Sequence, residues 1–433
     1  MLTKIGEGLE RFNPRRRYGR LTQVHGTVMR AAFAGLSQGT ICEVRQAGCA
    51  NLLAEVIGIE DDDVVLCPFG SVEGISAGAV VSQSSDELNI PVGKELLGRV
   101  IDAFGMPIDG LGQLSVGIAL RPIKGSVPPP MERPLIDKPL PTGIRAIDGT
   151  MTLGRGQRVG VFGPPGAGKS ALIEAISRHT AADVIVIGLV GERGREVREF
   201  VERDLPSKAR NRVVVVAATS DRPATERALC AHSATAVAEG FRDEGLSVLL
   251  LVDSLTRTAR ALREIGLAAG EAPTRRGFPA SVYPALPAII ERAGRHTKGD
   301  ITALYTVLLE DEKQADPIAE EVKSLTDGHF LLRRSLAEKG HYPALDVLES
   351  LSRCMSSIVS HEHNVSASRL RARLAKYREI ELLLQIGEYD SGGDPEADAA
   401  IAAKDSIDTF LQQSVSERLP FGRIVSAMQK AAP

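Results

Sequence analysis

Residues 163–170 read Gly-Pro-Pro-Gly-Ala-Gly-Lys-Ser, which is a complete G-x-x-x-x-G-K-[ST] phosphate loop. The loop follows a β-branched run at residues 158–162 and precedes a helix-like apolar segment at residues 171–176. Strand, glycine-rich loop and helix in this order are the context that the motif requires. The stretch therefore predicts a nucleoside triphosphate site at the end of a strand, and the alternative is a glycine turn formed by chance.

Each position of this loop has a physical role. Glycines let successive backbone N–H groups turn toward the phosphates, Lys169 reaches the β and γ oxygens, and the Ser170 hydroxyl is placed to ligate Mg²⁺. The helix that opens at Ser170 adds its positive end to the same site. The predicted nucleotide contacts are Gly163, Gly166, Ala167, Gly168, Lys169, Ser170 and Ala171.

Length and composition indicate a protein of two or three domains, because 433 residues exceed the size at which one hydrophobic core keeps growing. No apolar run approaches the roughly 20 residues that cross a bilayer. The first residues lack the features of a secretory signal, so we expect a cytosolic protein. A net charge of -3 with 4% aromatic residues argues against nucleic-acid partners and favours protein partners.

Metal-ligand spacing is missing from the five cysteines, which we expect to be reduced and buried: Cys42, Cys49, Cys67, Cys230 and Cys354. His361 and His363 form an H-x-H pair without a carboxylate or cysteine cluster nearby in sequence. We interpret the pair as the start of a helix, not as a metal site.

The pattern of apolar residues divides the chain into three parts. Short alternating stretches between residues 22 and 81 suggest a small β-barrel, and a proline- and glycine-rich extended connection follows at 84–153. From residue 158, β-branched runs alternate with helix-like segments, which predicts a parallel sheet covered by helices. Beyond residue 361 a helical cap is expected. The predicted domains are 1–88 (docking segment and barrel), 89–360 (phosphate-loop ATPase domain) and 361–433 (helical domain).

The first dozen residues place apolar side chains on one helical face, ahead of an arginine run: Leu2, Ile5, Leu9 and Phe12, then Arg15, Arg16 and Arg17. This pattern is typical of a helix that docks on a regulatory partner or an anionic membrane surface. The alternative is a helix packed on its own barrel with a solvated arginine run. Gly6 and Gly8 weaken any isolated helix.

Two carboxylates are candidates for the chemistry. Asp253 ends an apolar strand at residues 248–253, where it would hold the Mg²⁺ water shell beside the phosphates. Glu192 follows the strand after the phosphate-loop helix and could polarise an attacking water as the catalytic base. Its neighbours Arg193 and Glu196 could instead make Glu192 part of a surface ion network.

Several motifs resemble those of the rotary ATPase family, and within it most of all the ATPases of type III secretion systems. They are residues 97–102 (Leu-Gly-Arg-Val-Ile-Asp), 139–148 (Pro-Leu-Pro-Thr-Gly-Ile-Arg-Ala-Ile-Asp), 191–193 (Gly-Glu-Arg), 253–257 (Asp-Ser-Leu-Thr-Arg), 277–283 (Gly-Phe-Pro-Ala-Ser-Val-Tyr), 327–329 (Asp-Gly-His) and 340–344 (Gly-His-Tyr-Pro-Ala). The likeness covers nearly the whole chain. It implies a RecA-like core between the barrel and the helical domain.

Roles for single residues follow from this resemblance. Glu192 matches the water-activating glutamate, Lys169 belongs to the catalytic set, and Arg353 matches the arginine that such hexamers insert into a neighbour's site. Tyr342 matches an aromatic residue that packs on the adenine ring. The family implies ATP with Mg²⁺, a homohexamer, and a central stalk protein threading the pore. Residues 266–287, with Arg275 and Arg276, are then a candidate pore loop, or else a solvated connector.

The function implied is ATP hydrolysis at the cytoplasmic base of an export apparatus, peripheral to the inner membrane, with an injectisome favoured over a flagellum. Expected partners are a peripheral regulator at the N-terminus, chaperone–cargo complexes that the enzyme separates and unfolds, and the export gate. Two alternatives stay open: the catalytic subunit of a rotary ATP synthase or proton pump, and a hexameric RNA translocase.

Overall fold

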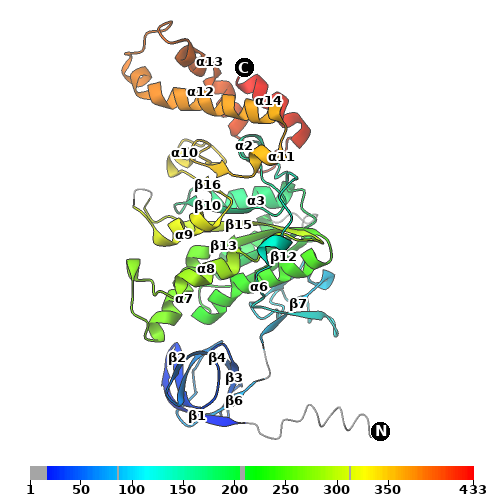
Figure 1. Cartoon of the computed structure of the whole chain (residues 1–433), viewed down its shortest axis with the longest axis vertical. Helices are drawn as coiled ribbons and strands as arrows, with labels where there is room; N and C mark the ends of the chain where they lie inside the picture. Colours follow the sequence, from blue (N-terminus) through cyan, green and yellow to red (C-terminus); the bar gives the residue numbers. More distant parts are fainter. Residues whose placement is uncertain (1–16, 85–86, 205–209, 312–313) are drawn as a thin grey trace.

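The computed structural model describes residues 17–84, 87–204, 210–311 and 314–433. Three parts follow one another along the long axis (Figure 1): a β-barrel, a mostly parallel sheet with helices on both faces, and a helical part. This arrangement confirms the predicted α/β core with a flanking barrel and a helical region. The domain limits at residues 88 and 360 stay predictions, and the apolar face and Arg15–Arg16 pair of the docking segment lie outside the described residues.

Within residues 17–84, six strands close into an antiparallel barrel of order β1-β2-β5-β4-β3-β6. Side chains alternate between the two sides of each strand, so Leu21, Met29 and Ala31 are buried while their neighbours face outward. The strands are β1 (Tyr18–His25), β2 (Val28–Ala32), β3 (Ile41–Arg45), β4 (Leu52–Glu60), β5 (Asp63–Pro68) and β6 (Val80–Gln83).

The central sheet has the strand order β17-β16-β10-β15-β13-β11-β12-β8, with β14 beside β15. Its pairings are parallel except those of β17 and β14. The strands are β8 (Val100–Ile101), β10 (Arg158–Gly163), β11 (Val184–Val190), β12 (Val213–Ala218), β13 (Ser247–Asp253), β14 (Gly294–Arg295), β15 (Asp300–Leu308), β16 (Gly328–Leu331) and β17 (Leu351–Ser352).

Both faces of this sheet are covered, which explains why its strands are apolar throughout. On β11, Ile185 and Ile187 pack into the cluster that contains α3, whereas Val184 and Val186 pack into the cluster that contains α6, α7, α8 and α9. The helices of this part are α2 (Arg145–Thr150), α3 (Lys169–His179), α4 (Gly194–Glu199) continued by the π-helical turn η3 (Phe200–Asp204), α6 (Ala224–Asp243), α7 (Leu255–Ala268), α8 (Val282–Ile290), α9 (Pro317–Leu325) and α10 (Arg334–Glu338).

Two segments have more regular structure than the sequence predicts. The connection at residues 84–153 contributes β8 to the edge of the central sheet and also forms a separate two-stranded sheet from β7 (Asn89–Val92) and β9 (Ala119–Pro122). It also contains the 3₁₀ turns η1 (Lys94–Leu96) and η2 (Pro130–Glu132). The candidate pore loop is shorter than 266–287, because α7 and α8 occupy its two ends and leave residues 269–281 with the turn η4 (Arg275–Gly277).

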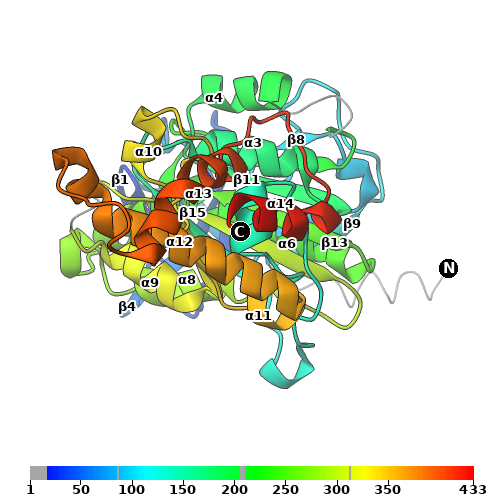
Figure 2. The same ribbon diagram turned by 90° about the horizontal axis from the view of Figure 1, so that it is seen from above.

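The C-terminal part consists of α11 (Met355–Ile358), α12 (His361–Ile386), α13 (Pro395–Leu411), the turn η5 (Phe421–Arg423) and α14 (Ile424–Ala431). As predicted, a helix begins at His361. From above, α12, α13 and α14 lie over the sheet (Figure 2), and all three contact α2. Leu382, Leu383 and Ile386 are exposed near the end of α12. No helix in the described ranges is both long enough and apolar enough to cross a membrane.

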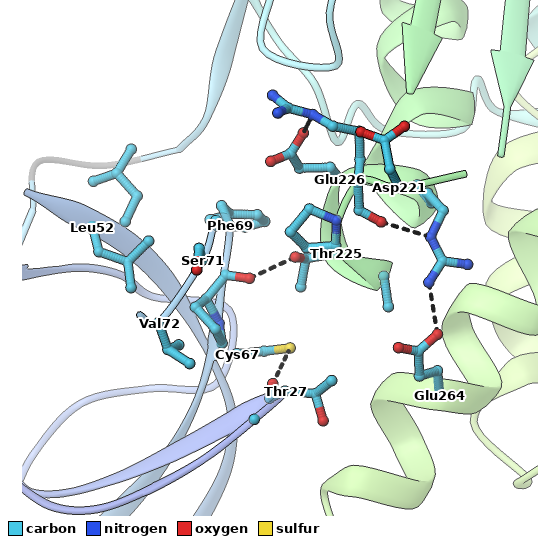
Figure 3. A pocket seen from close by; sticks show the side chains of 18 of the residues that line it. Thr27, Leu52, Cys67, Phe69, Ser71, Val72, Asp221, Thr225, Glu226 and Glu264 are labelled. Atoms are coloured by element: carbon cyan, nitrogen blue, oxygen red, sulfur yellow. Dashed lines mark hydrogen bonds and ion pairs between the residues drawn. The ribbon is translucent and has the colours of Figure 1, made fainter. Parts of the chain in front are cut away.

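A cavity of about 910 Å³ lies between the barrel and the central part and is lined by residues of both (Figure 3). The Thr225 hydroxyl donates a 2.5 Å hydrogen bond across it to the carbonyl of Pro68. Both arginines that line it, Arg222 and Arg227, are paired with carboxylates of the same wall. The phosphate loop does not line this cavity.

The five cysteines are free thiols. Cys42, Cys67 and Cys230 are buried, whereas Cys49 and Cys354 are half-buried. Burial raises the pKa of the Cys42 thiol to about 11, so this group stays protonated at neutral pH.

Candidate active site

The phosphate loop connects the end of β10 to the start of α3. Gly166 and Gly168 have φ angles of 79° and 87°, a region that side chains other than glycine rarely adopt. Gly163 is required for another reason, since a Cβ there would lie 2.9 Å from the Cβ of Leu332. Each glycine of the motif therefore has a backbone or packing requirement that the structure displays.

Lys169 is the first residue of α3, and its side chain is buried against the backbone of the loop. Its Nζ donates hydrogen bonds to the carbonyls of Gly163 (2.7 Å) and Pro164 (2.8 Å). Burial lowers the pKa of the Lys169 amine to about 8, although the carboxylates of Asp253 and Glu192 favour its charged form. The loop backbone thus fixes the Lys169 amine at the position where the phosphates of a nucleotide would bind.

Asp253 ends β13, two strands away from β10 in the sheet. Its Oδ1 accepts a 2.6 Å hydrogen bond from the Thr306 hydroxyl, and burial raises the pKa of the Asp253 carboxyl while that bond and Lys169 oppose the rise. Ser170 is exposed on the first turn of α3. A hydroxyl and a carboxylate are oxygen ligands that suit Mg²⁺ together with phosphate oxygens. Among the described residues, no group of three or more His, Cys, Asp or Glu side chains is placed to hold a metal ion.

Glu192 lies just past β11, and its Oε1 is 3.1 Å from Nη2 of Arg257 on α7. Burial raises the pKa of the Glu192 carboxyl to about 8, with further contributions from Glu196 and Asp253, and Arg257 opposes the rise. Arg193 pairs with Glu196 at 3.6 Å on the surface. Glu192 therefore points inward to Arg257, and its carboxyl also contacts Glu196. Glu192 lies on the side of the phosphate loop and also borders the surface ion pair of Arg193 and Glu196.

These two pKa values predict a bell-shaped pH dependence of kcat/KM with a maximum near pH 8. Below that pH Glu192 is increasingly protonated and cannot accept a proton, and above it Lys169 loses the charge that attracts phosphates. Each limb is expected to change by up to about tenfold per pH unit. Steady-state kinetics between pH 6 and 10 measure it.

Equilibrium binding separates the two limbs. Glu192→Gln should keep the alkaline fall in ATP affinity, since that limb comes from Lys169. A flat profile across this range would mean that neither group titrates there in the free enzyme.

Tyr342 lies beside the phosphate loop, on the connection that follows α10. A Cβ on Gly168 would be 3.3 Å from Cε1 of the Tyr342 ring, and the Tyr342 side chain is 44% exposed. An exposed ring edge against the loop is free to meet the base of a nucleotide whose phosphates occupy the loop. The structure thus brings Tyr342 into the same site as Lys169.

Arg353 lies elsewhere. Its backbone N–H donates to the carbonyl of Asp327 (3.0 Å), whose own N–H donates to the carbonyl of Arg158 at the start of β10 (2.8 Å). The phosphate loop begins at Gly163, at the other end of β10. At the usual rise of a strand, Gly163 is about 16 Å from Arg158. The Arg353 side chain is exposed and has no hydrogen-bond or ion-pair partner within the described chain. The sheet therefore separates Arg353 from the loop of its own subunit.

Sequence reasoning gave no individual role to Arg257 or Thr306, both of which contact a candidate carboxylate. Arg257 could have been found, because it lies one helical turn after Asp253 at the start of a helix that follows a buried strand. Thr306 carried no signal, since its place beside Asp253 depends on the pairing of β13 with β15.

Comparison with known proteins agrees with this architecture part by part. Residues 21–84 match the β-barrel domain of the ATP synthase alpha/beta family, and residues 143–352 match its nucleotide-binding domain. Residues 359–430 match the C-terminal domain of the type III secretion ATPase EscN. A type 3 secretion system ATPase of Sinorhizobium fredii is 49% identical over 430 residues, covering 99% of this chain and 95% of the relative.

The chain belongs to the type III secretion ATPases.

Other relatives extend the match. The ATPase of Xanthomonas euvesicatoria is 53% identical over 403 residues, covering 93% of this chain and 91% of the relative. A flagellum-specific ATP synthase of Bacillus subtilis is 43% identical over 411 residues, with 94% of each chain covered. The secretion-specific C-terminal domain favours an export ATPase over the two alternatives, a rotary pump subunit and an RNA translocase.

Solved structures match as closely. The assembled EscN of enteropathogenic E. coli superposes with a TM-score of 0.92 at 44% identity, covering 96% of this chain and 100% of EscN. EscN in complex with its central stalk EscO gives a TM-score of 0.88 at 43% identity, with the same coverage. This type III secretion ATPase is therefore a nucleotide-binding ATPase of the alpha/beta family.

Proposed function

We propose that this type III secretion ATPase hydrolyses ATP in sites shared by two copies of the chain. One copy supplies the phosphate loop and Glu192, and the next supplies Arg353. The observation that carries the proposal is the position of Arg353 at the amino end of β10, exposed and unpaired in the described chain, while the loop lies at the carboxyl end. An arginine in that place can serve a phosphate of a neighbouring copy far more readily than its own.

The chemistry assigned to one boundary is phosphoryl transfer to water. Lys169 binds the β and γ phosphates, Glu192 accepts the proton of the attacking water at its free carboxylate oxygen, and Arg353 of the adjacent copy faces the charge that builds on the γ-phosphoryl. Ser170 and Asp253 would hold Mg²⁺, which neutralises phosphate charge when bound. The backbone at Gly163, Gly166, Ala167, Gly168 and Ala171 cradles the phosphates, and Tyr342 contacts the adenine ring.

A closed ring satisfies every boundary with identical subunits, so the proposed assembly is a homohexamer. The assembled state of EscN and its complex with the stalk EscO support this proposal and that of a central stalk partner. Arg275 and Arg276 of the candidate pore loop are 3.7 and 3.3 Å from carboxylates on or at the start of α9, so the loop is braced on the ATPase part and can face a stalk.

The work proposed for this ring is release of chaperones from cargo and unfolding of that cargo before type III export, in an injectisome more than in a flagellum. The identities of 49% and 53% to secretion ATPases, against 43% to a flagellar one, support that branch. The N-terminal segment would meet a peripheral regulator or the inner-membrane surface on the cytoplasmic side, and cargo would pass to the export gate.

Specific ATPase activity is expected to rise with protein concentration, because a lone copy has no Arg353 within reach of its phosphate loop. Phosphate release measured from nanomolar to micromolar protein, with mass measured by light scattering at each point, checks this. Activity and mass should rise together. Constant specific activity in a demonstrably monomeric sample would overturn the shared site.

A further inference from the structure

The turn at residues 412–417, which follows α13, packs against the nucleotide-binding part. Gln413 in this turn is only 7% exposed. Its Oε1 accepts a 2.8 Å hydrogen bond from the N–H of Arg145, and its Nε2 donates to the carbonyls of Gly143 (2.8 Å) and Glu417 (2.6 Å). A buried amide with both ends bonded joins the helical part to the start of α2.

These partners fix which way the amide points. A flipped Gln413 would place its oxygen against two carbonyl oxygens and its NH₂ against the N–H of Arg145, so every contact would become repulsive. The side chain therefore has one favourable orientation. Breaking it leaves buried backbone groups without partners, which is costly.

The backbone of Gln413 reaches the nucleotide site. Its N–H donates a 2.7 Å hydrogen bond to the carbonyl of Tyr342, the residue whose ring lies against Gly168 of the phosphate loop. A second contact runs from the same turn to the far end of the phosphate-loop helix, where Nε2 of His179 is 2.9 Å from the carbonyl of Val415. The turn is thus hydrogen-bonded to both Tyr342 and α3.

We propose that Gln413 is a positioning residue for nucleotide binding: it fixes the 412–417 turn so that the backbone bond to Tyr342 holds the Tyr342 ring at the edge of the phosphate loop, where it meets the base. The inference rests on the proposed contact between Tyr342 and adenine. It goes further in making a residue of the helical domain, outside the phosphate-loop part, a determinant of ATP affinity. Because Gln413 acts on the base and not on the phosphates, it should affect ATP and not a bare polyphosphate.

The test compares Gln413→Ala, Tyr342→Ala and the double variant with the wild type in the full chain. The ligands are a non-hydrolysable ATP analogue and inorganic tripolyphosphate, both with Mg²⁺, and kcat and KM are measured for ATP. Gln429→Ala is the matched control, because Gln429 is an exposed glutamine of the same helical part whose amide donates to Glu362. If the alanine variant does not fold, Gln413→Asn replaces it in the comparison, because asparagine keeps the amide on a side chain that is one methylene shorter.

Gln413→Ala should weaken binding of the ATP analogue by about 2- to 10-fold, the range for losing one aromatic contact. Its tripolyphosphate affinity and its kcat at saturating ATP should stay at the wild-type level, as should both affinities of Gln429→Ala. In the Tyr342→Ala background the Gln413 change should add nothing, because both substitutions remove the same contact.

Three results would overturn the inference, and they are distinguishable. A Tyr342→Ala variant that weakens ATP binding while Gln413→Ala does not would leave the adenine contact standing without Gln413. An unchanged affinity in Tyr342→Ala would remove the adenine contact itself. A parallel loss of ATP and tripolyphosphate affinity in Gln413→Ala would show that the turn supports α3 as a whole and not the Tyr342 ring.

Discussion

Replacing Glu192 by glutamine is expected to reduce ATP hydrolysis by about 10²- to 10⁴-fold, the usual contribution of a general base. Glutamine keeps the shape of the side chain and can still accept a hydrogen bond from Arg257, but it cannot take a proton from water. ATP binding should persist, because Lys169 and the loop glycines remain in place. Phosphate release at saturating ATP, together with equilibrium binding of ATP, measures both halves of this expectation.

Glu199→Gln is the matched control for this experiment. Glu199 is another carboxylate of α4 and is paired with Arg195 at 3.0 Å at the surface, so its loss should leave most of the activity. Glu192→Gln should also bind chaperone–cargo complexes without separating them on addition of ATP, which links hydrolysis to the proposed work. A Glu192→Gln enzyme that keeps more than about a tenth of the wild-type rate would show that another group activates water.

Replacing Arg353 by alanine is expected to lower turnover by about 10³- to 10⁵-fold, the contribution typical of an arginine finger. Folding of the subunit should be unaffected, because the exposed Arg353 side chain has no partner in the described part of its own chain. Arg369→Ala is a control, since Arg369 is another exposed arginine, on α12. Turnover, thermal unfolding and ring mass, measured for both variants, separate a catalytic loss from a structural one.

Mixing variants tests where Arg353 acts. Lys169→Ala and Arg353→Ala are each expected to be inactive alone, but in mixed rings an intact phosphate loop of one variant meets an intact Arg353 of the other. Activity should therefore return in the mixture and should depend on subunit exchange. An inactive mixture, with mixed rings confirmed by mass, would mean that Arg353 serves its own subunit.

Much of the fold followed from local pattern. Period-2 alternation in residues 22–81 predicted the barrel, and the continuous apolar runs ending near Val190 and Asp253 predicted a sheet buried on both faces, because burial on one or two sides leaves its mark directly on the strand's own residues. The short strands β8 and β17 were missed, since two residues at a sheet edge carry no periodicity of their own. The exposed Leu382 and Ile386 show the same limit in a helix, where apolar character alone does not say what covers it.

The sequence by itself determined that this protein has a phosphate loop, a glutamate (Glu192) after the strand that follows the phosphate-loop helix, and an aspartate (Asp253) at the end of a later strand. It could do so because a motif of contiguous residues also fixes its local backbone. Only the tertiary structure decided that Glu192 meets Arg257, that Tyr342 touches Gly168 and is bonded to Gln413, and that Arg353 lies at the opposite end of β10 from the loop. Those relations join residues far apart in the chain. They depend on strand order and on how the helical part packs on α2 and α3, and neither is written in any single stretch of residues.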